Sequence, residues 1–286
     1  VHSSTYDDER IKQLKRDPKV KVLTFPDNPI GTIAALYADS QTISRGMPAR
    51  GTIVFPAGSK LHLHATWVAT ENMSAFKSLP KDAISTLSLA NLPVSDLDLT
   101  YLESLTDLDG LTLYDDDEIT DDGITSILKL KNLSNLELGG TRVTGRGISR
   151  LSALVKLRVL RLDRIVLDRE GLQVFAKLPA LAYLTLGNSE LTDGKLAEMQ
   201  NLKSLTFLSL HANPGITAAG MKYLIGDRAL ENLELNGCSI GPQAIKYLKQ
   251  LKNLKNLTIT LSGWSAADKS ALVKALPECK IGNLAK

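Results

Sequence analysis

The chain has 286 residues, of which 43% are hydrophobic and only 5% aromatic, and its formal net charge is +3. This length is enough for a substantial aliphatic core, and the small net charge gives no indication of a nucleic acid or a membrane surface as the partner. No apolar run approaches the roughly 18 residues that a membrane-spanning helix needs.

The first 70 residues are predicted to form a small β module. Four short segments are rich in β-branched residues or alternate in hydropathy, and Pro, Gly, Asp and Asn separate them: 20–25, 31–38, 50–56 and 60–66. Residues 1–17 are expected to form an arm or a short helix around 10–14. We expect the module to cover the first coil of the repeats that follow it, because terminal repeats need a covering element.

His62 and His64 alternate on one face of the last of these strands. Two imidazoles are suitable zinc ligands, but the sequence shows no third ligand beside them. An ordinary surface strand is therefore favoured, and the sequence predicts no metal site.

From residue 79 onward the chain repeats a Leu-x-Leu pair every 24 or 25 residues. One further step of 24 residues reaches Ile281, so a ninth, partial unit is expected at the end. Within a unit the apolar residues recur every third position, which fits neither a long helix nor an alternating strand. A closed coil explains the pattern, with a short strand whose two leucines point inward and a short helix on the opposite side. The pairs begin at Leu87, Leu111, Leu136, Leu160, Leu184, Leu208, Leu233 and Leu257.

The segment ITDDGI, residues 119–124, marks the start of such a helix. Thr120 or Asp121 can accept hydrogen bonds from the free backbone donors of the first turn. Gly123 permits either a close approach or an unusual backbone angle. In a later unit Asp227 falls where the register requires an apolar residue, so we expect a bent or shortened helix there.

The acidic run 114–122 has six carboxylates between Asp115 and Asp122. Oxygen-rich loops of this kind can hold calcium, although the spacing does not match an EF-hand loop. A solvated acidic edge is favoured, and calcium binding is left open.

The two cysteines are expected to be free thiols. Cys238 lies three residues after a core leucine, in a position that other units fill with Thr141, Ser189 and Asn213, so a buried structural role is favoured. Cys279 lies in the final unit, more than one coil further along the chain, and no disulfide between the two is expected.

Units of the form LxxLxLxxTxITDxGLxxLxxL resemble leucine-rich repeats, and in particular the bacterial variety whose helices open with TDxGL. The resemblance covers roughly residues 79–284. It implies an α/β fold: a right-handed, horseshoe-shaped solenoid with a parallel sheet on its concave side and short helices on its convex side. The expected domains are the β module, 1–70, and the solenoid, 71–286. The family brings no single activity with it.

The concave sheet is the candidate binding site, because its outward side chains are not needed for the core. Adjacent strands are about 4.8 Å apart, so Glu137 and Arg161 are expected to be neighbours, as are Tyr183 and Phe207. Eight such strands make a surface suited to a protein, a peptide or a polysaccharide. Exposed aromatic residues beside arginine and histidine are typical of an interface hot spot, although such side chains can also simply cover one another. The predicted ligand-binding residues are Tyr114, Glu137, Arg158, Arg161, Asp163, Tyr183, Thr185, Phe207, Ser209, His211, Glu234 and Asn236.

The sequence shows no catalytic motif and predicts neither an enzyme nor a cofactor. We expect a monomeric recognition module that binds a protein or glycan partner and no nucleic acid. The alternative is the repeat portion of a secreted effector or ubiquitin-ligase-type adaptor whose other domain is absent. The chain begins with Val1, so an amino-terminal segment is expected to have been removed. The localisation is unknown, with export or the cell envelope left open.

Overall fold

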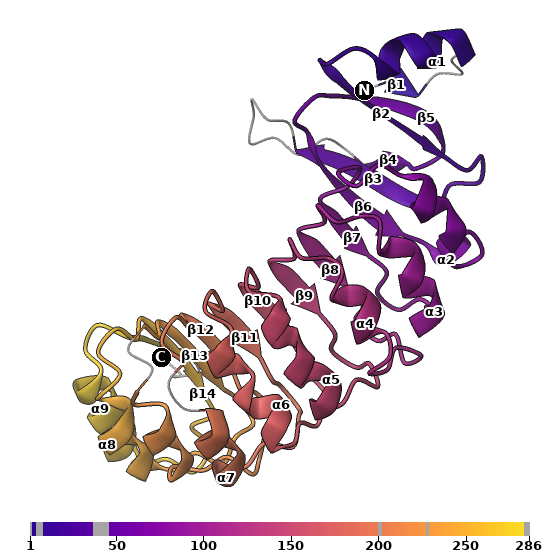
Figure 1. The fold of residues 1–286 in the computed structure, drawn as a ribbon. Helices are drawn as coiled ribbons and strands as arrows, with labels where there is room; N and C mark the ends of the chain where they lie inside the picture. The colour runs from indigo at the N-terminus through magenta and orange to yellow at the C-terminus, as the bar shows by residue number, and fades with distance from the viewer. Residues whose placement is uncertain (1, 4–7, 37–45, 200–201, 227–228, 283–286) are drawn as a thin grey trace. The chain divides into compact units, whose positions relative to one another are not determined.

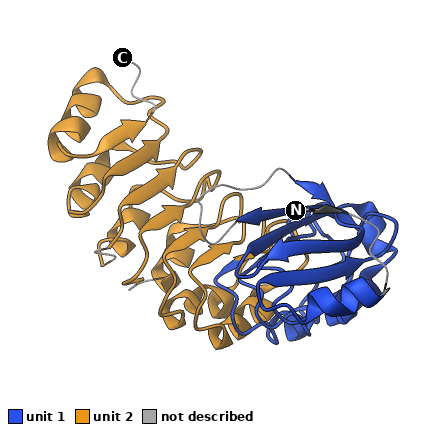
Figure 2. Ribbon diagram, turned by 90° about the horizontal axis from the view of Figure 1, so that it is seen from above, with its two compact units in different colours: residues 1–135 blue, residues 136–286 orange. Residues whose placement is uncertain are grey.

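The computed structural model describes residues 2–3, 8–36, 46–199, 202–226 and 229–282 (Figure 1). These residues form two compact units, 1–135 and 136–286 (Figure 2). The irregular helix predicted around Asp227 and the last two residues of the predicted strand 31–38 lie outside the described residues.

Unit 1 begins with strands and continues with two complete coils. Its strands are β1 (His2–Ser3), β2 (Val20–Phe25), β3 (Gly31–Leu36), β4 (Met47–Pro48), β5 (Gly51–Pro56), β6 (Lys60–Ala65), β7 (Thr86–Ser88) and β8 (Gly110–Thr112). Its helices are α1 (Asp8–Lys15), α2 (Trp67–Thr70), η1 (Met73–Ser78), α3 (Asp96–Leu99), η2 (Thr100–Leu102) and α4 (Ile124–Ile127), where η denotes a 3-10 helix. The four strands and the short helix predicted before residue 70 are thus confirmed in position.

Two sheets organise unit 1. β1, β5 and β2 form an antiparallel three-stranded sheet, and β4, β3 and β6 form a second antiparallel set. β6 also pairs in parallel with β7, and β7 with β8, so the parallel ladder of the repeats starts on β6. The boundary predicted at residue 70 therefore falls just after a hydrogen-bonded strand, and the division of the chain there stays a prediction.

Unit 2 consists of further coils of the same kind, each with one short strand and one short helical segment. β9 (Asn135–Glu137) lies at the boundary of the units, and β10 (Val159–Arg161), β11 (Tyr183–Thr185), β12 (Phe207–Ser209), β13 (Asn232–Leu235), β14 (Asn256–Ile259) and β15 (Lys280–Gly282) follow. The helices are α5 (Gly145–Ser149), η3 (Arg150–Ala153), α6 (Arg169–Gln173), η4 (Phe175–Lys177), α7 (Asp193–Leu196), η5 (Ala197–Met199), η6 (Gly220–Tyr223), η7 (Pro242–Ala244), α8 (Ile245–Leu248) and α9 (Ala266–Ala275).

The leucines align the strands of unit 2 in register. Leu160 pairs with Leu184, Leu184 with Leu208, and the series continues through Leu233 and Leu257 to Ile281. The five leucines are 0–1% exposed, because each coil covers the core of the next. β15 is the strand of the ninth, partial repeat that the sequence predicted at the end of the chain, so that prediction is confirmed.

Pairs of aspartate and threonine link the helix starts of successive coils. Asp96 accepts hydrogen bonds from the backbone nitrogen and the hydroxyl of Thr120, at 2.9 and 2.5 Å, and Asp193 does the same for Thr217. A Cβ atom on Gly123 would collide with the Asp96 carboxylate. The glycine of this motif therefore provides room for the carboxylate of the preceding coil. Its φ of −60° is an ordinary helical angle, so the close approach is what requires glycine.

A left-handed residue follows each of the strands β7 to β13, two positions after the second inward leucine. At several of these positions the amide donates to a carbonyl of the next coil, as Arg164 does to Gly187 at 2.8 Å and Ala212 to Asn236 at 2.6 Å. The position turns the chain out of the sheet while keeping one inter-coil hydrogen bond. It is occupied by Asn91, Asp115, Gly140, Arg164, Asn188, Ala212 and Gly237, with φ between 52° and 74°.

One residue further along, small polar side chains hold neighbouring coils together inside the fold. Asn213 accepts from the amides of Ser189 and Leu191 and donates to the carbonyls of Leu186 and Leu210. Cys238 Sγ lies 3.1 Å from the Leu210 carbonyl oxygen. The buried role predicted for this thiol is confirmed, and both cysteines are free.

Candidate functional site

The outer face of the sheet in unit 2 is formed by the side chains that alternate with the buried leucines. They fall into three rows that run across the strands, because equivalent residues of successive coils are in register. The first row is Val159, Tyr183, Phe207, Asn232 and Asn256; the second is Glu137, Arg161, Thr185, Ser209, Glu234 and Thr258; the third includes Asp163, Gly187, His211 and Asn236.

Two aromatic rings stack in the first row. The ring centroids of Tyr183 and Phe207 are 4.0 Å apart and the ring planes differ by 5°. The Arg161 guanidinium carbon lies 4.8 Å from the Tyr183 centroid. Both faces of Tyr183 are thus in contact, with Phe207 on one side and Arg161 on the other. A ligand therefore meets the ring edges and the phenol rather than an open ring face. The neighbour relation predicted for Tyr183 and Phe207 is confirmed.

Two carboxylates accompany Arg161: Glu137 on the neighbouring strand β9, and Asp163 two residues further along the chain, just after β10. β9 and β10 are neighbours in the sheet, which places Glu137 beside Arg161 as predicted. Burial raises the pKa of the Glu137 carboxyl above its usual range; the positive charge of Arg161 opposes this shift and the negative charge of Asp163 adds to it. The part of the outer face around Arg161 therefore combines one guanidinium with two carboxylates.

Asp163 and Thr185 form a connection between β10 and β11. The carboxylate of Asp163 accepts from the Thr185 hydroxyl at 2.5 Å and from the Gly187 amide at 2.6 Å. Thr185 is 6% exposed, and Ser209, its neighbour in the second row, is 2% exposed. These two predicted binding residues are buried rather than exposed.

His211 lies over Gly187 in the third row. A Cβ atom on Gly187 would collide with the imidazole, so the missing side chain makes room for the ring. His211 Nδ1 is 3.0 Å from the hydroxyl oxygen of Ser209. This contact resembles part of a nucleophile–base pair, but the serine is buried and so is not accessible to a substrate.

The remaining predicted residues are more scattered. Arg158 is exposed but precedes β10, and Val159 occupies the strand position beside Tyr183. Glu234 pairs in register with Ser209, and Asn236 lies one coil beyond His211. Tyr114 follows β8 in unit 1 and is half-buried.

Sequence reasoning missed an amide pair in the first row. Asn256 Nδ2 donates to Asn232 Oδ1 at 2.7 Å, on the side of Phe207 away from Tyr183. Asn232 and Asn256 are 24 residues apart, which is one repeat, so the sequence already indicated that they lie side by side. The first row thus presents an aliphatic residue, two aromatic residues and two amides in succession.

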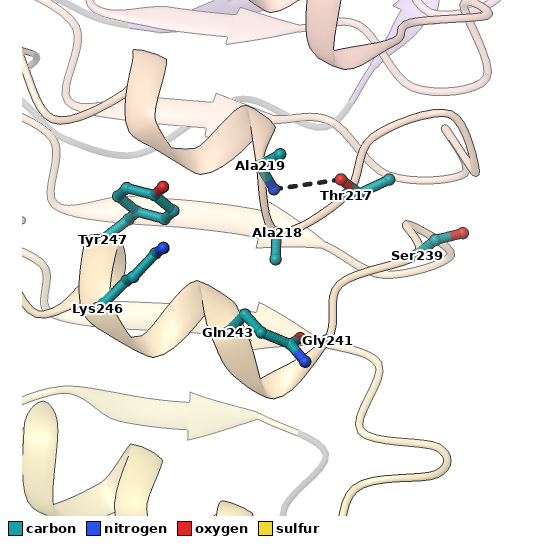
Figure 3. Close-up of a pocket in the computed structure, with 8 residues that line it drawn as sticks. All are labelled: Thr217, Ala218, Ala219, Ser239, Gly241, Gln243, Lys246 and Tyr247. Carbon is teal, nitrogen blue, oxygen red and sulfur yellow. Dashed lines mark hydrogen bonds between the residues drawn. The ribbon is translucent and has the colours of Figure 1, made fainter.

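A recess with a volume of about 380 Å³ lies on the helical side of unit 2. Figure 3 shows its lining, in which the Ala219 amide donates to the Thr217 hydroxyl and Lys246 lies near Tyr247. The Lys246 ammonium is 4.7 Å from the centroid of the Tyr247 ring. This recess provides a cation and an aromatic ring, but no buried polar group of its lining points to a ligand.

The described residues give few indications of metal or membrane chemistry. Within the ranges that the structure covers, no group of three or more His, Cys, Asp and Glu side chains is placed to hold a metal ion. None of the described helices has the length and apolar character needed to cross a bilayer.

Coils of 24 or 25 residues, each with a short parallel strand and a short helical segment, fit a leucine-rich repeat solenoid. No family model matches the chain. It is 30% identical over 169 residues to the "Putative adenylate cyclase regulatory protein" of Trypanosoma equiperdum, a match that covers 57% of this chain and 25% of that protein. It is 28% identical over 131 residues to Tsukushi of Gallus gallus, with 46% of this chain and 35% of that protein covered.

The chain therefore spans about a quarter to a third of the length of these curated relatives. Among solved structures, internalin C2 of Listeria monocytogenes is similar, with a TM-score of 0.46, 28% identity, and coverage of 63% of this chain and 82% of the internalin chain. At a TM-score below 0.5 the likeness does not by itself establish a common fold.

Proposed function

We propose that the chain is a non-enzymatic recognition module that binds a protein partner through the concave side of its repeat sheet. The observation that carries the proposal is the stack of Arg161, Tyr183 and Phe207 on the outer face of unit 2. These side chains are large, lie on the side of the sheet opposite the leucine core, and are only partly covered. Tyr, Trp and Arg are the residue types that most often dominate binding energy in protein interfaces.

The shape of the stack supports a protein or peptide rather than a small metabolite. Because both faces of Tyr183 are in contact, the accessible parts are ring edges, the phenol and the guanidinium. Ring edges carry partial positive charge and pack against the faces of other aromatic rings. A guanidinium pairs with carboxylates. A peptide that offers aromatic and acidic side chains is complementary to this arrangement.

Further features belong to the same proposal. The Asp–Thr pairs between successive coils support the TDxGL type of repeat. We also infer a right-handed solenoid, because a connection between parallel strands of one sheet is right-handed in about 98% of cases. The antiparallel strands before residue 70 would cover the first coil of the array. We also propose that the module acts as a monomer, without cofactor or nucleic acid.

A binding screen with the intact chain tests the proposed function. The chain is presented to a random peptide library and to a glycan array, and captured ligands are measured again with Tyr183→Ala/Phe207→Ala. We expect peptide capture that falls at least tenfold in the double variant, since hot-spot truncations cost about 2 kcal/mol or more.

Tyr247→Ala is the matched control. This tyrosine also has a cation near its ring but lies on the helical side, so capture should be unchanged. Equal loss in both proteins, or capture of glycans alone, would contradict a protein site on the outer face.

A further inference from the structure

A hollow of about 250 Å³ lies on the sheet of unit 1 around two histidines. β6 places His62 and His64 on the same side of the sheet, because side chains two residues apart in a strand point the same way. The residues beside them in register are small: Thr32, Ala34, Thr86 and Ser88. The two imidazoles therefore stand in open space that can accommodate an ion with its water ligands.

Thr86 orients one of the imidazoles. His62 Nδ1 is 2.6 Å from the Thr86 hydroxyl oxygen. When Nδ1 carries the hydrogen and donates it to this hydroxyl, Nε2 keeps its lone pair. A hydrogen bond from the nitrogen that does not bind the metal is the usual way in which proteins orient a metal-binding histidine. The His64 ring is exposed and can turn toward the same point.

We propose that His62 and His64 bind one divalent transition-metal ion in this hollow, Cu²⁺ more tightly than Zn²⁺. Two residues along a strand span about 6.6 Å, a separation that two imidazoles can bridge with metal–nitrogen bonds of about 2.0 Å. The general order of affinities for nitrogen ligands places Cu²⁺ above Zn²⁺. Because the described residues contain no group of three or more such ligands, water completes the coordination and the ion is exchangeable.

This site is independent of the proposed binding surface, which uses residues of unit 2. The His-x-His pattern alone favoured an ordinary surface strand. The hollow of small side chains and the contact with Thr86 are the observations that change this interpretation.

Copper titration of the full chain, followed by calorimetry and electron paramagnetic resonance, tests the proposal. All proteins carry His2→Ala, so that the histidine near the amino terminus does not compete. We expect one Cu²⁺ per chain with nitrogen hyperfine coupling, and about tenfold or greater loss of affinity in His62→Gln and in His64→Gln.

His211→Gln is the matched control, since His211 is also on an outer sheet face and should not affect the copper affinity. Thr86→Val keeps both imidazoles and removes the orienting hydroxyl, and should weaken binding severalfold while the thermal unfolding curve stays unchanged. His64 is exposed, so His64→Gln remains informative if His62→Gln does not fold. Absence of stoichiometric binding by the parent, or undiminished binding by folded His64→Gln, overturns the proposal.

Discussion

Asp116 occupies the buried polar position of its coil, where Asn213 and Ser189 stand in later coils. Its side chain is 1% exposed, and Oδ1 accepts from the Leu92 amide at 2.9 Å. Oδ2 has no hydrogen-bond partner among the described residues. Burial raises the pKa of this carboxyl to about 7; the charges of Asp115 and Asp117 add to the rise, and the bonds from Leu92 and Asn91 oppose it.

This pKa predicts a pH-dependent stability. The folded state favours the protonated form, so the contribution of Asp116 to the free energy of unfolding is fully present below about pH 4 and is lost as the pH rises through about 7. A rise from 3.8 to about 7 corresponds to on the order of 4 kcal/mol. Asp116→Asn removes the ionisable group. The free energy of unfolding of the variant, relative to that of the unmodified chain, should therefore be higher at pH 8 than at pH 4.5. Urea unfolding at both pH values measures the difference, which should not vary with pH if the carboxyl titrates normally.

Asn213 allows the reciprocal experiment. It is 0% exposed, and its amide group donates to the carbonyls of Leu186 and Leu210. Asn213→Asp places a carboxylate against these carbonyls, and should lower the free energy of unfolding by about 3 kcal/mol at pH 8 and by less at pH 4.5. Asn188→Asp, at an exposed left-handed position, is the control and should change it by less than about 0.5 kcal/mol. Equal losses at both positions would show that burial is not the cause.

Among the elements, the turns that follow strands β7 to β13 require a residue in the left-handed backbone conformation. Gly237 has φ of +72°, and a Cβ atom there would lie 3.0 Å from Ala212 Cα. Gly237→Ala should therefore destabilise the chain by about 1–2 kcal/mol. Gly194 lies in helix α7, where a Cβ atom has ample space, and Gly194→Ala should stabilise by about 0.5–1 kcal/mol. Thermal unfolding of the two variants distinguishes a turn glycine from a helix glycine by the sign of the change.

The strands themselves separate two kinds of residue. In β11, Leu184 is fully buried while Tyr183 beside it is half-buried on the outer face. This alternation was predictable from the sequence, because side chains in a strand point to opposite sides in turn. How the outer side chains cover one another was not predictable from it.

For each unit as a whole, the aliphatic core is continuous from coil to coil. Leu184→Ala opens a cavity in this core and should cost about 2–5 kcal/mol. Tyr183→Ala/Phe207→Ala removes a ring stack outside the core and should cost only about 1 kcal/mol. Chemical denaturation compares the two proteins directly. If the aromatic pair costs as much as the leucine, these rings are part of the structural core and the proposed binding surface is misplaced.

The 24-residue spacing determined the coil, the inward leucines, the strand positions and the buried thiol at Cys238. The physical reason is that regularly spaced leucines can all be buried only when successive coils stack in register. The same register identified Tyr183 and Phe207 as neighbours, and could also have identified Asn232 and Asn256.

Only the tertiary structure decided which outer side chains are accessible. Thr185 and Ser209 are buried, Arg158 lies outside the strand, and both faces of Tyr183 are in contact. The buried oxygen of Asp116 without a partner and the hollow around His62 and His64 are likewise visible only in the tertiary structure. A repeat pattern specifies the direction of each side chain, whereas its exposure is set by packing between neighbouring coils.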